Sequence, residues 1–388
     1  MVFGSDKPRL GGGLENDAGV GRRALTLLAA VMATLLVAGT AQAVVYVDDT
    51  PEPSWRVDGR VFATVIVGDI VIVGGNFTNA VSPTGQLVAR RHLAAFDLDT
   101  GQVLTNWRAD AGSPVRALVS NGSSVWVGGT FGRLGGQVRS RVGSIDAMTG
   151  AVLPDFRVTL DNNVRALALE GNDLYVGGMF TVANGQTRSR LAKFDATTGA
   201  LDTTFRASAN DQVWALAKNP VSGVLFAAGR FSSLSGASRS GVGAVLTSTG
   251  AATGPAYASS ARPTLALDVS DDGTRLFGAG GTLANELSAW NPTTGTRVWR
   301  VVTMGDNQAV KYYGGYVYVG FHDGYQNDTS LKLLAVNWTN GAVDPDFRPR
   351  FDRFWGVYAI DATSAGLVVG GDFTRVSGVA SQGWVRFL

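Results

Sequence analysis

The sequence predicts an all-β fold made of repeated antiparallel units, and three recurring features support this prediction. An aromatic–arginine pair returns at a spacing of roughly 50 residues, which is typical of stacked supersecondary units. In each unit a pair of small residues ends one apolar strand, and a turn built on Asp or Asn follows the next strand. The chain contains 51 glycines in 388 residues, which suits a fold with many tight turns.

The aromatic–arginine pair marks the fourth strand of each unit. Because a strand alternates its faces, we expect the aromatic side chain to pack between units while the arginine reaches across to an acid. Asp155, Asp202 and Asp346 are near such arginines in the sequence. We therefore interpret the pair as structural. Its six copies and one degenerate copy are Trp55-Arg56, Trp107-Arg108, Phe156-Arg157, Phe205-Arg206, Tyr257-Ala258, Trp299-Arg300 and Phe347-Arg348.

Residues 164–206 show the repeated unit most clearly. Apolar stretches at 164–169, 174–178 and 191–195 are separated by turns rich in Gly, Asn and Asp, and Phe205-Arg206 ends the unit. Short β-branched and aromatic segments between such turns predict a four-stranded antiparallel meander.

The small residues that end the second strand would let neighbouring sheets approach closely. Seven such positions occur, which gives the number of units: Gly74-Gly75, Gly128-Gly129, Gly177-Gly178, Ala228-Gly229, Ala279-Gly280, Gly320-Phe321 and Gly370-Gly371.

An Asp or Asn begins the turn after the third strand at Asp97, Asp146, Asp195, Asn291 and Asn337. Its side chain can accept backbone N–H groups, and the glycine that follows adopts positive φ at low cost. We interpret these residues as turn formers. The segment that starts at Asp97 is also a fragment of a calcium loop, but it lacks the distal glutamate of such a loop.

The two ends of the chain indicate how the units are joined. The chain enters with a fourth-type strand, Trp55-Arg56-Val57, and stops on a third-type strand, Trp384–Leu388. In a ring the N-terminal strand would complete the last sheet, which protects the sheet edges. The prediction for residues 54–388 is therefore a seven-bladed β-propeller of four-stranded antiparallel blades, with Trp55 beside the final strand.

The first residues have the features of a targeting segment. Arg22-Arg23 precede an apolar run from Ala24 to Ala38, and Ala41-Gln42-Ala43 fits a cleavage site. We expect residues 1–43 to be a signal peptide with a long n-region, residues 44–53 to be a linker, and the mature chain to be secreted. Retention of the leader as an anchor is the alternative, and the general and twin-arginine export routes both stay open.

Composition excludes several classes of site and partner. The formal net charge is +2, so the composition does not indicate the strongly basic surface that binds nucleic acid. With no cysteine and two histidines it cannot form disulfides, thiolate metal sites or a histidine-rich metal cage. We expect no cofactor, no metal, no membrane span after cleavage, and a monomer.

Residues 174–206, which include LYVGGMFT and RSRLAKFDATTGALDTTFR, resemble the delta-60 repeat of bacterial extracytoplasmic β-propellers. That resemblance implies a propeller and export, with no common chemistry. Residues 97–107 and 291–299 are also similar to the tryptophan-docking repeats of quinoprotein dehydrogenases, which bind pyrroloquinoline quinone beside calcium. This chain departs from that pattern because it has no cysteine pair and no evident calcium-binding set of carboxylate and Asn.

The strongest candidate binding site is the mouth of the central channel, where ligands of propellers usually meet the loops that lead into the innermost strands. Polar loops begin at Asp161, Asn210, Asp306 and Asp352. Aromatic, amide and guanidinium groups converging there would suit a sugar, a peptide or a carboxylate, although the same ring could merely fill and solvate the channel. The candidate residues are Phe62, Arg116, Asn163, Arg165, Gln212, Trp214, Gln308 and Tyr358.

A second candidate surface is an arc of arginines in the loop before each third strand. These loops would lie on one face of the ring and form a local basic arc, unless each arginine is solvated or paired with an acid. The arc comprises Arg90-Arg91, Arg139-Ser140-Arg141, Arg188-Ser189-Arg190 and Arg239-Ser240.

These features favour an exported, non-enzymatic binding or scaffold module whose ligand is a protein, a peptide or a glycan. The alternative is a propeller enzyme, either a glycan hydrolase or lyase or a degenerate quinoprotein. A cluster of acid, base and metal ligands at the channel mouth would favour the enzyme, whereas the sequence places carboxamides and arginines there. We assign no catalytic residue.

Overall fold

The computed structural model describes residues 48–257, 263–281 and 284–388. The chain divides into two compact units, Met1–Ala43 and Val44–Leu388, and only the second contains described residues. The predicted signal peptide thus lies outside the described residues. All regular elements in the described ranges are β-strands. Those ranges hold no helix long and apolar enough to cross a membrane.

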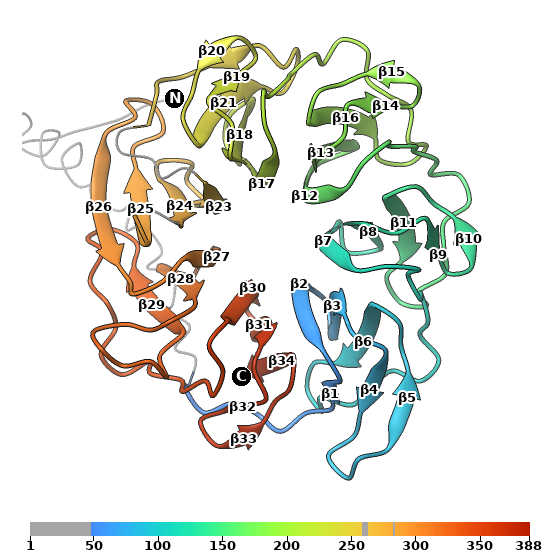
Figure 1. The fold of residues 1–388 in the computed structure, drawn as a ribbon, viewed down its shortest axis with the longest axis vertical. Coiled ribbons are helices and arrows are strands. Elements are labelled where there is room, and N and C mark those ends of the chain that lie inside the picture. Colours follow the sequence, from blue (N-terminus) through green and yellow to red (C-terminus); the bar gives the residue numbers. More distant parts are fainter. Residues whose placement is uncertain (1–47, 258–262, 282–283) are drawn as a thin grey trace, which may run out of the picture. The chain divides into compact units, whose positions relative to one another are not determined.

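Seven antiparallel sheets are arranged around a common centre, each with one strand innermost (Figure 1). The innermost strands follow one another around that centre, and each contacts its two neighbours, including β2 against β30. They are β2 (Arg60–Val67), β7 (Val115–Ser120), β12 (Val164–Glu170), β17 (Val213–Lys218), β23 (Thr264–Val269), β27 (Asn307–Tyr313) and β30 (Gly356–Thr363).

The second strand of each sheet pairs with the innermost strand on one side and with the third strand on the other. The second strands are β3 (Ile70–Asn76), β8 (Ser124–Gly129), β13 (Asp173–Gly178), β18 (Val224–Gly229), β24 (Leu276–Gly280), β28 (Tyr316–Phe321) and β31 (Gly366–Asp372). The third strands are β6 (Leu93–Asp97), β11 (Val142–Asp146), β16 (Leu191–Asp195), β21 (Val242–Leu246), β25 (Glu286–Trp290), β29 (Leu333–Asn337) and β34 (Trp384–Phe387).

The predicted fourth strands are mostly shorter than expected. Only β22 (Ala252–Thr253) and β26 (Arg297–Val302) form a fourth strand in their sheets. In four other sheets the fourth segment makes a single bridge, as Leu201 does with Phe194. The prediction of a strand at Phe205-Arg206 was therefore wrong. Asp202 explains the difference, because its side chain accepts the N–H groups of Thr204 and Phe205 and turns the chain away from the sheet edge.

Short hairpins connect the second and third strands on the outside of the molecule. They are β4 (Asn79–Val81) with β5 (Leu87–Ala89), β9 (Arg133–Leu134) with β10 (Gln137–Val138), β14 (Val182–Ala183) with β15 (Gln186–Thr187), β19 (Ser233–Leu234) with β20 (Ala237–Ser238), and β32 (Arg375–Val376) with β33 (Val379–Ala380).

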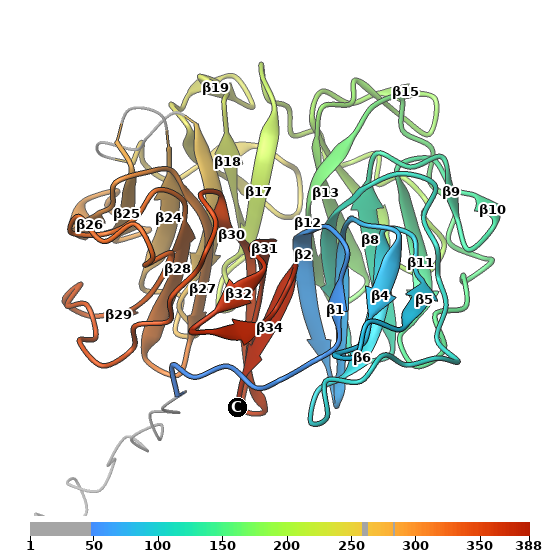
Figure 2. The same cartoon turned by 60° about the horizontal axis from the view of Figure 1, so that its bottom comes forward.

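The segment before the first sheet runs along the last one (Figure 2). Glu52 bridges Arg386 of β34, and its N–H donates to the Arg386 carbonyl over 3.0 Å. Trp55 packs in the same apolar cluster as Trp384. The pairing differs in detail from the prediction, because β1 (Arg56–Val57) pairs with β4 rather than with the last strand.

The core is divided into seven apolar clusters that lie between neighbouring sheets. Each cluster contains one aromatic residue of the repeated pair, so the prediction that these residues pack between units is confirmed. They are Trp55, Trp107, Phe156, Phe205, Tyr257, Trp299 and Phe347.

The turns and close approaches also follow the predictions. Asp97 accepts the N–H and the hydroxyl of Thr100, each over 2.7 Å, and the glycine that follows, Gly101, has a φ of 67°. A Cβ at Gly177 would come 2.7 Å from Cγ1 of Val213, on the innermost strand of the next sheet. Glycine is therefore required there because two sheets approach each other closely.

Candidate functional site

A β-bulge interrupts the innermost strand of every sheet at the same position. In β2, Val61 pairs with Gly75 and Ala63 with Gly74, so Phe62 between them has no partner in the ladder. Such a bulge redirects the side chain of the extra residue. The bulged residues are Phe62, Arg116, Arg165, Trp214, Leu265, Gln308 and Tyr358.

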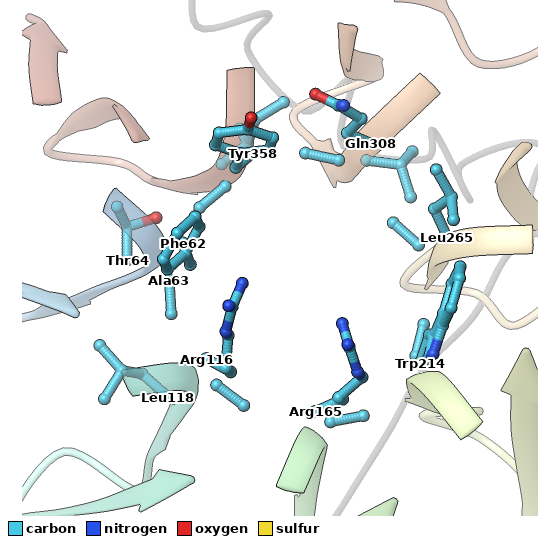
Figure 3. A pocket seen from close by; sticks show the side chains of 18 of the residues that line it. Phe62, Ala63, Thr64, Arg116, Leu118, Arg165, Trp214, Leu265, Gln308 and Tyr358 are labelled. Carbon is cyan, nitrogen blue, oxygen red and sulfur yellow. The ribbon is translucent and has the colours of Figure 1, made fainter. Parts of the chain in front are cut away.

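The seven bulged side chains line one cavity at the centre of the sheets, with a volume of about 550 Å³ (Figure 3). An alanine follows each bulged residue and also lines the cavity. Arg60 completes the lining. Deeper along the strands the cavity is bounded by a largely aliphatic layer: Thr64, Leu118, Leu167, Leu216, Leu267, Val310 and Ile360.

Phe62, Tyr358 and Arg116 form one contiguous group in this cavity. The centroids of the Phe62 and Tyr358 rings lie 5.5 Å apart at an interplanar angle of 56°. The Arg116 guanidinium lies over the Phe62 ring, 4.1 Å from its centroid. This arrangement is a cation–π contact that holds the guanidinium at the cavity wall.

Arg165 and Trp214 form a second group on the neighbouring strands. The Arg165 guanidinium lies 5.3 Å from the centroid of the Trp214 ring. The indole nitrogen of Trp214 donates to Oε1 of Gln212 over 2.7 Å, which fixes the orientation of the ring. Gln212 thus positions the tryptophan and does not itself line the cavity.

Gln308 joins the cavity to an exposed aromatic cluster on the loop before β30. With its amide oriented toward acceptors, its nitrogen donates to the carbonyls of Trp355 and Val357 over 3.0 and 3.1 Å. Phe354 and Trp355 are 52% and 44% exposed, and both contact the ring of His322. A large apolar surface is therefore connected to the rim of the cavity through the Gln308 amide.

The ionisable residues that line the cavity are three arginines and Tyr358, with no carboxylate among the lining residues. Arg60 forms an ion pair with Asp372 over 2.9 Å. Across the described ranges, neither Arg116 nor Arg165 lies within ion-pair distance of a carboxylate. The described lining is therefore positively charged, with two cations that no acid of the described ranges neutralises.

Burial shifts the pKa of each of these groups in the direction that favours its neutral form. It lowers the pKa of the Arg116 and Arg165 guanidinium groups, and the charge of Arg116 lowers the pKa of Arg165 further. Both arginines stay charged at neutral pH because their ordinary pKa is so high. Burial also raises the pKa of the Tyr358 hydroxyl to about 12, so that group stays protonated and can donate a hydrogen bond.

The structure brings six of the eight sequence candidates into the cavity and leaves two outside its lining. Gln212 contacts Trp214 from outside the cavity, and Asn163 lies before the bulge at Arg165. Leu265 lines the cavity but was not among the candidates. The alanine after every bulged residue is the signal that would have found it, since Leu265-Ala266 aligns with Trp214-Ala215.

The polar loops that enter the innermost strands have a largely structural role. Asp161 accepts the N–H groups of Thr181 and Val182, over 2.8 and 3.0 Å. Asn210 does the same for Ser232 and Ser233. Burial alone would raise the pKa of Asp161, but hydrogen bonds from Thr181 and Val182 lower it overall. These side chains hold the outer hairpins in place.

The basic arc is not formed, because all of its arginines except the exposed Arg91 donate to backbone carbonyl groups. Arg90 and Arg139 are each 3% exposed. Arg139 donates to the carbonyls of Val138 and Leu153, and thereby ties the loop before the third strand to the fourth segment. Arg141 and Arg190 adopt positive φ, at 73° and 71°, and donate back to carbonyls of the preceding loop. Such hydrogen bonds offset the cost of burying the charges.

The arginines of the aromatic–arginine pairs find acids in only some units. Arg108 pairs with Asp110 over 2.7 Å, and Arg300 pairs with Glu286 over 3.2 Å. In contrast, Arg348 donates its Nε–H to the carbonyl of Pro345. In the described ranges, none of these arginines forms an ion pair with Asp155, Asp202 or Asp346, and Asp202 pairs with Lys193 instead. In the described part of the chain, no group of three or more His, Asp or Glu side chains could hold a metal ion.

Comparison with known proteins supports the fold. Residues 172–205 match a family model described as "Domain of unknown function (DUF5122) beta-propeller". No curated protein sequence matches the chain. The crystal structure of the WD40 β-propeller domain of Doa1 is similar with a TM-score of 0.59 at 11% identity, covering 87% of this chain and 97% of that one. The computationally designed Ika8 protein is similar with a TM-score of 0.54 at 16% identity, covering 87% of this chain and all of that one. The chain is therefore an all-β protein with the β-propeller fold.

Proposed function

We propose that residues 54–388 form a closed seven-bladed β-propeller that binds a ligand in the cavity at its centre, and that the protein is an exported, non-enzymatic binding module. The ligand is a protein segment, a peptide or a glycan. The export part of the proposal rests on the leader-like residues 1–43 and on the resemblance to delta-60 repeats.

Contacts between the first and last sheets support closure. Asp361 of β30 accepts the N–H of Ile66 on β2 over 2.8 Å. A Cβ at Gly370 would come 2.5 Å from Cγ1 of Val61, which repeats the close approach seen between the other sheets. Glu52 adds the fourth-segment contact to β34. These three contacts join residues about 300 positions apart, which supports a ring in which the last sheet packs against the first.

The observation that carries the binding proposal is the contrast between two adjacent positions of the innermost strands. The residue after the bulge is alanine in all seven strands, as a packing requirement demands. The bulged residue itself is Phe, Arg, Arg, Trp, Leu, Gln or Tyr, although the backbone geometry is the same. If the bulged position served only to form the fold, the same residue type would be expected in all seven strands. The variety of side chains therefore supports an asymmetric ligand site.

The size and chemistry of the cavity also suit a ligand. Small-molecule sites are concave cavities of roughly 300–1,000 Å³ with an apolar lining and a few oriented polar groups. The central cavity, at about 550 Å³, has an aliphatic floor, three aromatic rings, an amide and guanidinium groups. It could accept a terminal residue of a peptide or one or two sugar rings.

A binding array tests this proposal. The full chain is applied to glycan and peptide arrays, and hits are measured by calorimetry with the wild type and with Trp214→Ala. We expect Trp214→Ala to weaken binding at least about tenfold, as removal of a central aromatic residue does in a binding site. Val138→Ala serves as the control, because Val138 is 68% exposed on the outer strand β10. Unchanged binding by Trp214→Ala would show that the cavity is not the site.

A further inference from the structure

We propose that Arg116 and Arg165 together form a receptor for a carboxylate group, so that the ligand of the central cavity is an acid. This inference rests on the proposed binding function and narrows its ligand class. It follows from the placement of the two arginines, from their lack of acidic partners in the described ranges and from the way their guanidinium groups are held.

The two guanidinium groups come from adjacent innermost strands, β7 and β12, and both extend into the cavity (Figure 3). Each occupies a bulge position, so the backbone itself directs the side chain inward. Like charges repel, and the positive charge of Arg116 acts on Arg165. Bringing two cations together in a half-buried cavity costs free energy that an anion between them would recover.

Other arginines of this chain show what normally occupies a buried guanidinium. The buried Arg139 and Arg90 donate to carbonyl oxygens. The Nε atom of Arg165 is buried without a partner among the described residues, but so are those of Arg90 and Arg139. The difference lies at the terminal nitrogens, which donate to carbonyls in Arg90 and Arg139 and have no hydrogen-bond partner among the described residues in Arg116 and Arg165. Unpaired donors in a partly buried site are unfavourable, so the cavity presents terminal N–H groups that a ligand can pair.

The way the arginines are held favours a planar acid group. Each guanidinium packs on an aromatic ring, Arg116 on Phe62 and Arg165 on Trp214. Ring contact restricts the side chain but leaves the N–H groups at the edge of the guanidinium available. Planar guanidinium groups bind carboxylates through two parallel hydrogen bonds, which a lysine cannot reproduce. Tyr358, protonated because its pKa is raised by burial to about 12, can add a third donor.

The ligand need not be known to test this receptor. The full chain, labelled with ¹⁵N-arginine, is titrated with malonate and, separately, with the neutral diamide malonamide, and the arginine Nε–H signals are followed by NMR. Arg116→Lys and Arg165→Lys assign the two signals. Arg133 serves as the internal reference, because it lies on the exposed outer strand β9 and donates to the carbonyl of Gly136.

We expect malonate to shift the Arg116 and Arg165 signals saturably, with no such shift from malonamide and at most a linear drift for Arg133. The double variant Arg116→Gln/Arg165→Gln should lower the malonate affinity at least about tenfold, measured by calorimetry. Arg133→Gln should leave it unchanged. Equal responses of Arg133 and the pair, or malonate affinity that survives in the double variant, would overturn the receptor.

The two proposals fail in distinguishable ways. If array ligands depend on Trp214 but bind equally well as free acids and as neutral methyl esters or amides, the cavity is a binding site and the carboxylate receptor is wrong. If malonate titrates the arginine pair but no array ligand depends on Trp214, the receptor stands and the assignment of a protein, peptide or glycan ligand is wrong. Matched acid and ester saccharides, and peptides with free or amidated C-termini, then identify the carrier of the carboxylate.

Discussion

Gly177 shows how a single side chain sets the distance between two sheets. A Cβ at this position would lie 2.7 Å from Cγ1 of Val213 and 3.3 Å from Cδ1 of Leu216. Both neighbours belong to the innermost strand of the next sheet and are buried. Since Val213, the nearer neighbour, is completely buried, an added methyl group would push the two sheets apart.

We expect Gly177→Ala to lower the free energy of unfolding by about 1–3 kcal/mol, the usual cost of overpacking a dense core. Denaturant titration of the full chain measures this change in the free energy of unfolding. Gly132→Ala is the matched control, because a Cβ at Gly132 has no heavy atom within 4 Å. That variant should stay within about 0.5 kcal/mol of the wild type. Equal effects of the two substitutions would contradict the close approach of the sheets.

Individual residues differ in how far their roles could be predicted. The turn role of Asp97 was predictable, because it depends on residues only three positions away. The role of Arg139 was not, because its carbonyl partner at Leu153 is set by the path of the fourth segment. Leu265 was missed for a different reason. An aliphatic residue in a strand looks like core, and only its alignment with Trp214 shows that it faces the cavity.

Adjacent innermost strands are joined by side chains as well as by packing. Asp361 on β30 accepts the N–H of Ile66 on β2 over 2.8 Å, and it pairs with Lys311 on β27 over 3.2 Å. Burial would lower the pKa of Lys311, but the carboxylates of Asp361 and Asp268 raise it overall. One carboxylate thus connects three consecutive strands around the centre.

Replacing this carboxylate should loosen the junction between the last and first sheets. We expect Asp361→Asn to destabilise the protein by about 1–3 kcal/mol, because Lys311 loses its ion pair in a site with little solvent. Thermal or denaturant unfolding measures the change. Asp69→Asn, in the exposed turn between β2 and β3, is the control and should change stability by less than about 0.5 kcal/mol. A loss no greater than that of the control would rule out a stabilising role for this contact.

The innermost three strands of each unit were predictable because their apolar patterns are local and repeat. The fourth strands were predicted less well. Hydrophobic pattern located the aromatic residues correctly between the sheets, as Phe205 shows. It could not reveal that Asp202 would turn the chain before a strand formed, because that depends on hydrogen bonds from Thr204 and Phe205.

The candidate site depends on the arrangement of all seven sheets. Its side chains come from strands spread over about 300 residues of sequence, and they converge only because each innermost strand carries a bulge at the same level. Six members of the site could be predicted, since equivalent positions in a repeat meet at one axis. Asn163 and Gln212, each two positions before a bulged residue, do not line the cavity, although Arg60 at the equivalent position does.

The contact of β2 with β30 brings Phe62 and Tyr358, from the first and last sheets, into one site, and we propose that it closes a ring. The chain has no cysteine, so a pair of introduced cysteines reports closure without interference. Glu52 and Arg386 are bridge partners across the junction. Cα atoms paired in this way lie roughly 4.5–5.5 Å apart, which suits a disulfide.

The decisive measurement is disulfide formation in the double variant Glu52→Cys/Arg386→Cys of the full chain, at low protein concentration. Glu52→Cys/Val138→Cys serves as the control, because Val138 lies on the outer strand β10 of another sheet. Mass spectrometry under non-reducing conditions should show an intramolecular disulfide between the two introduced cysteines in most molecules of the first variant and free thiols in the control. Free thiols in both variants, with native-like circular dichroism, would contradict a closed ring and with it the convergence of the seven side chains.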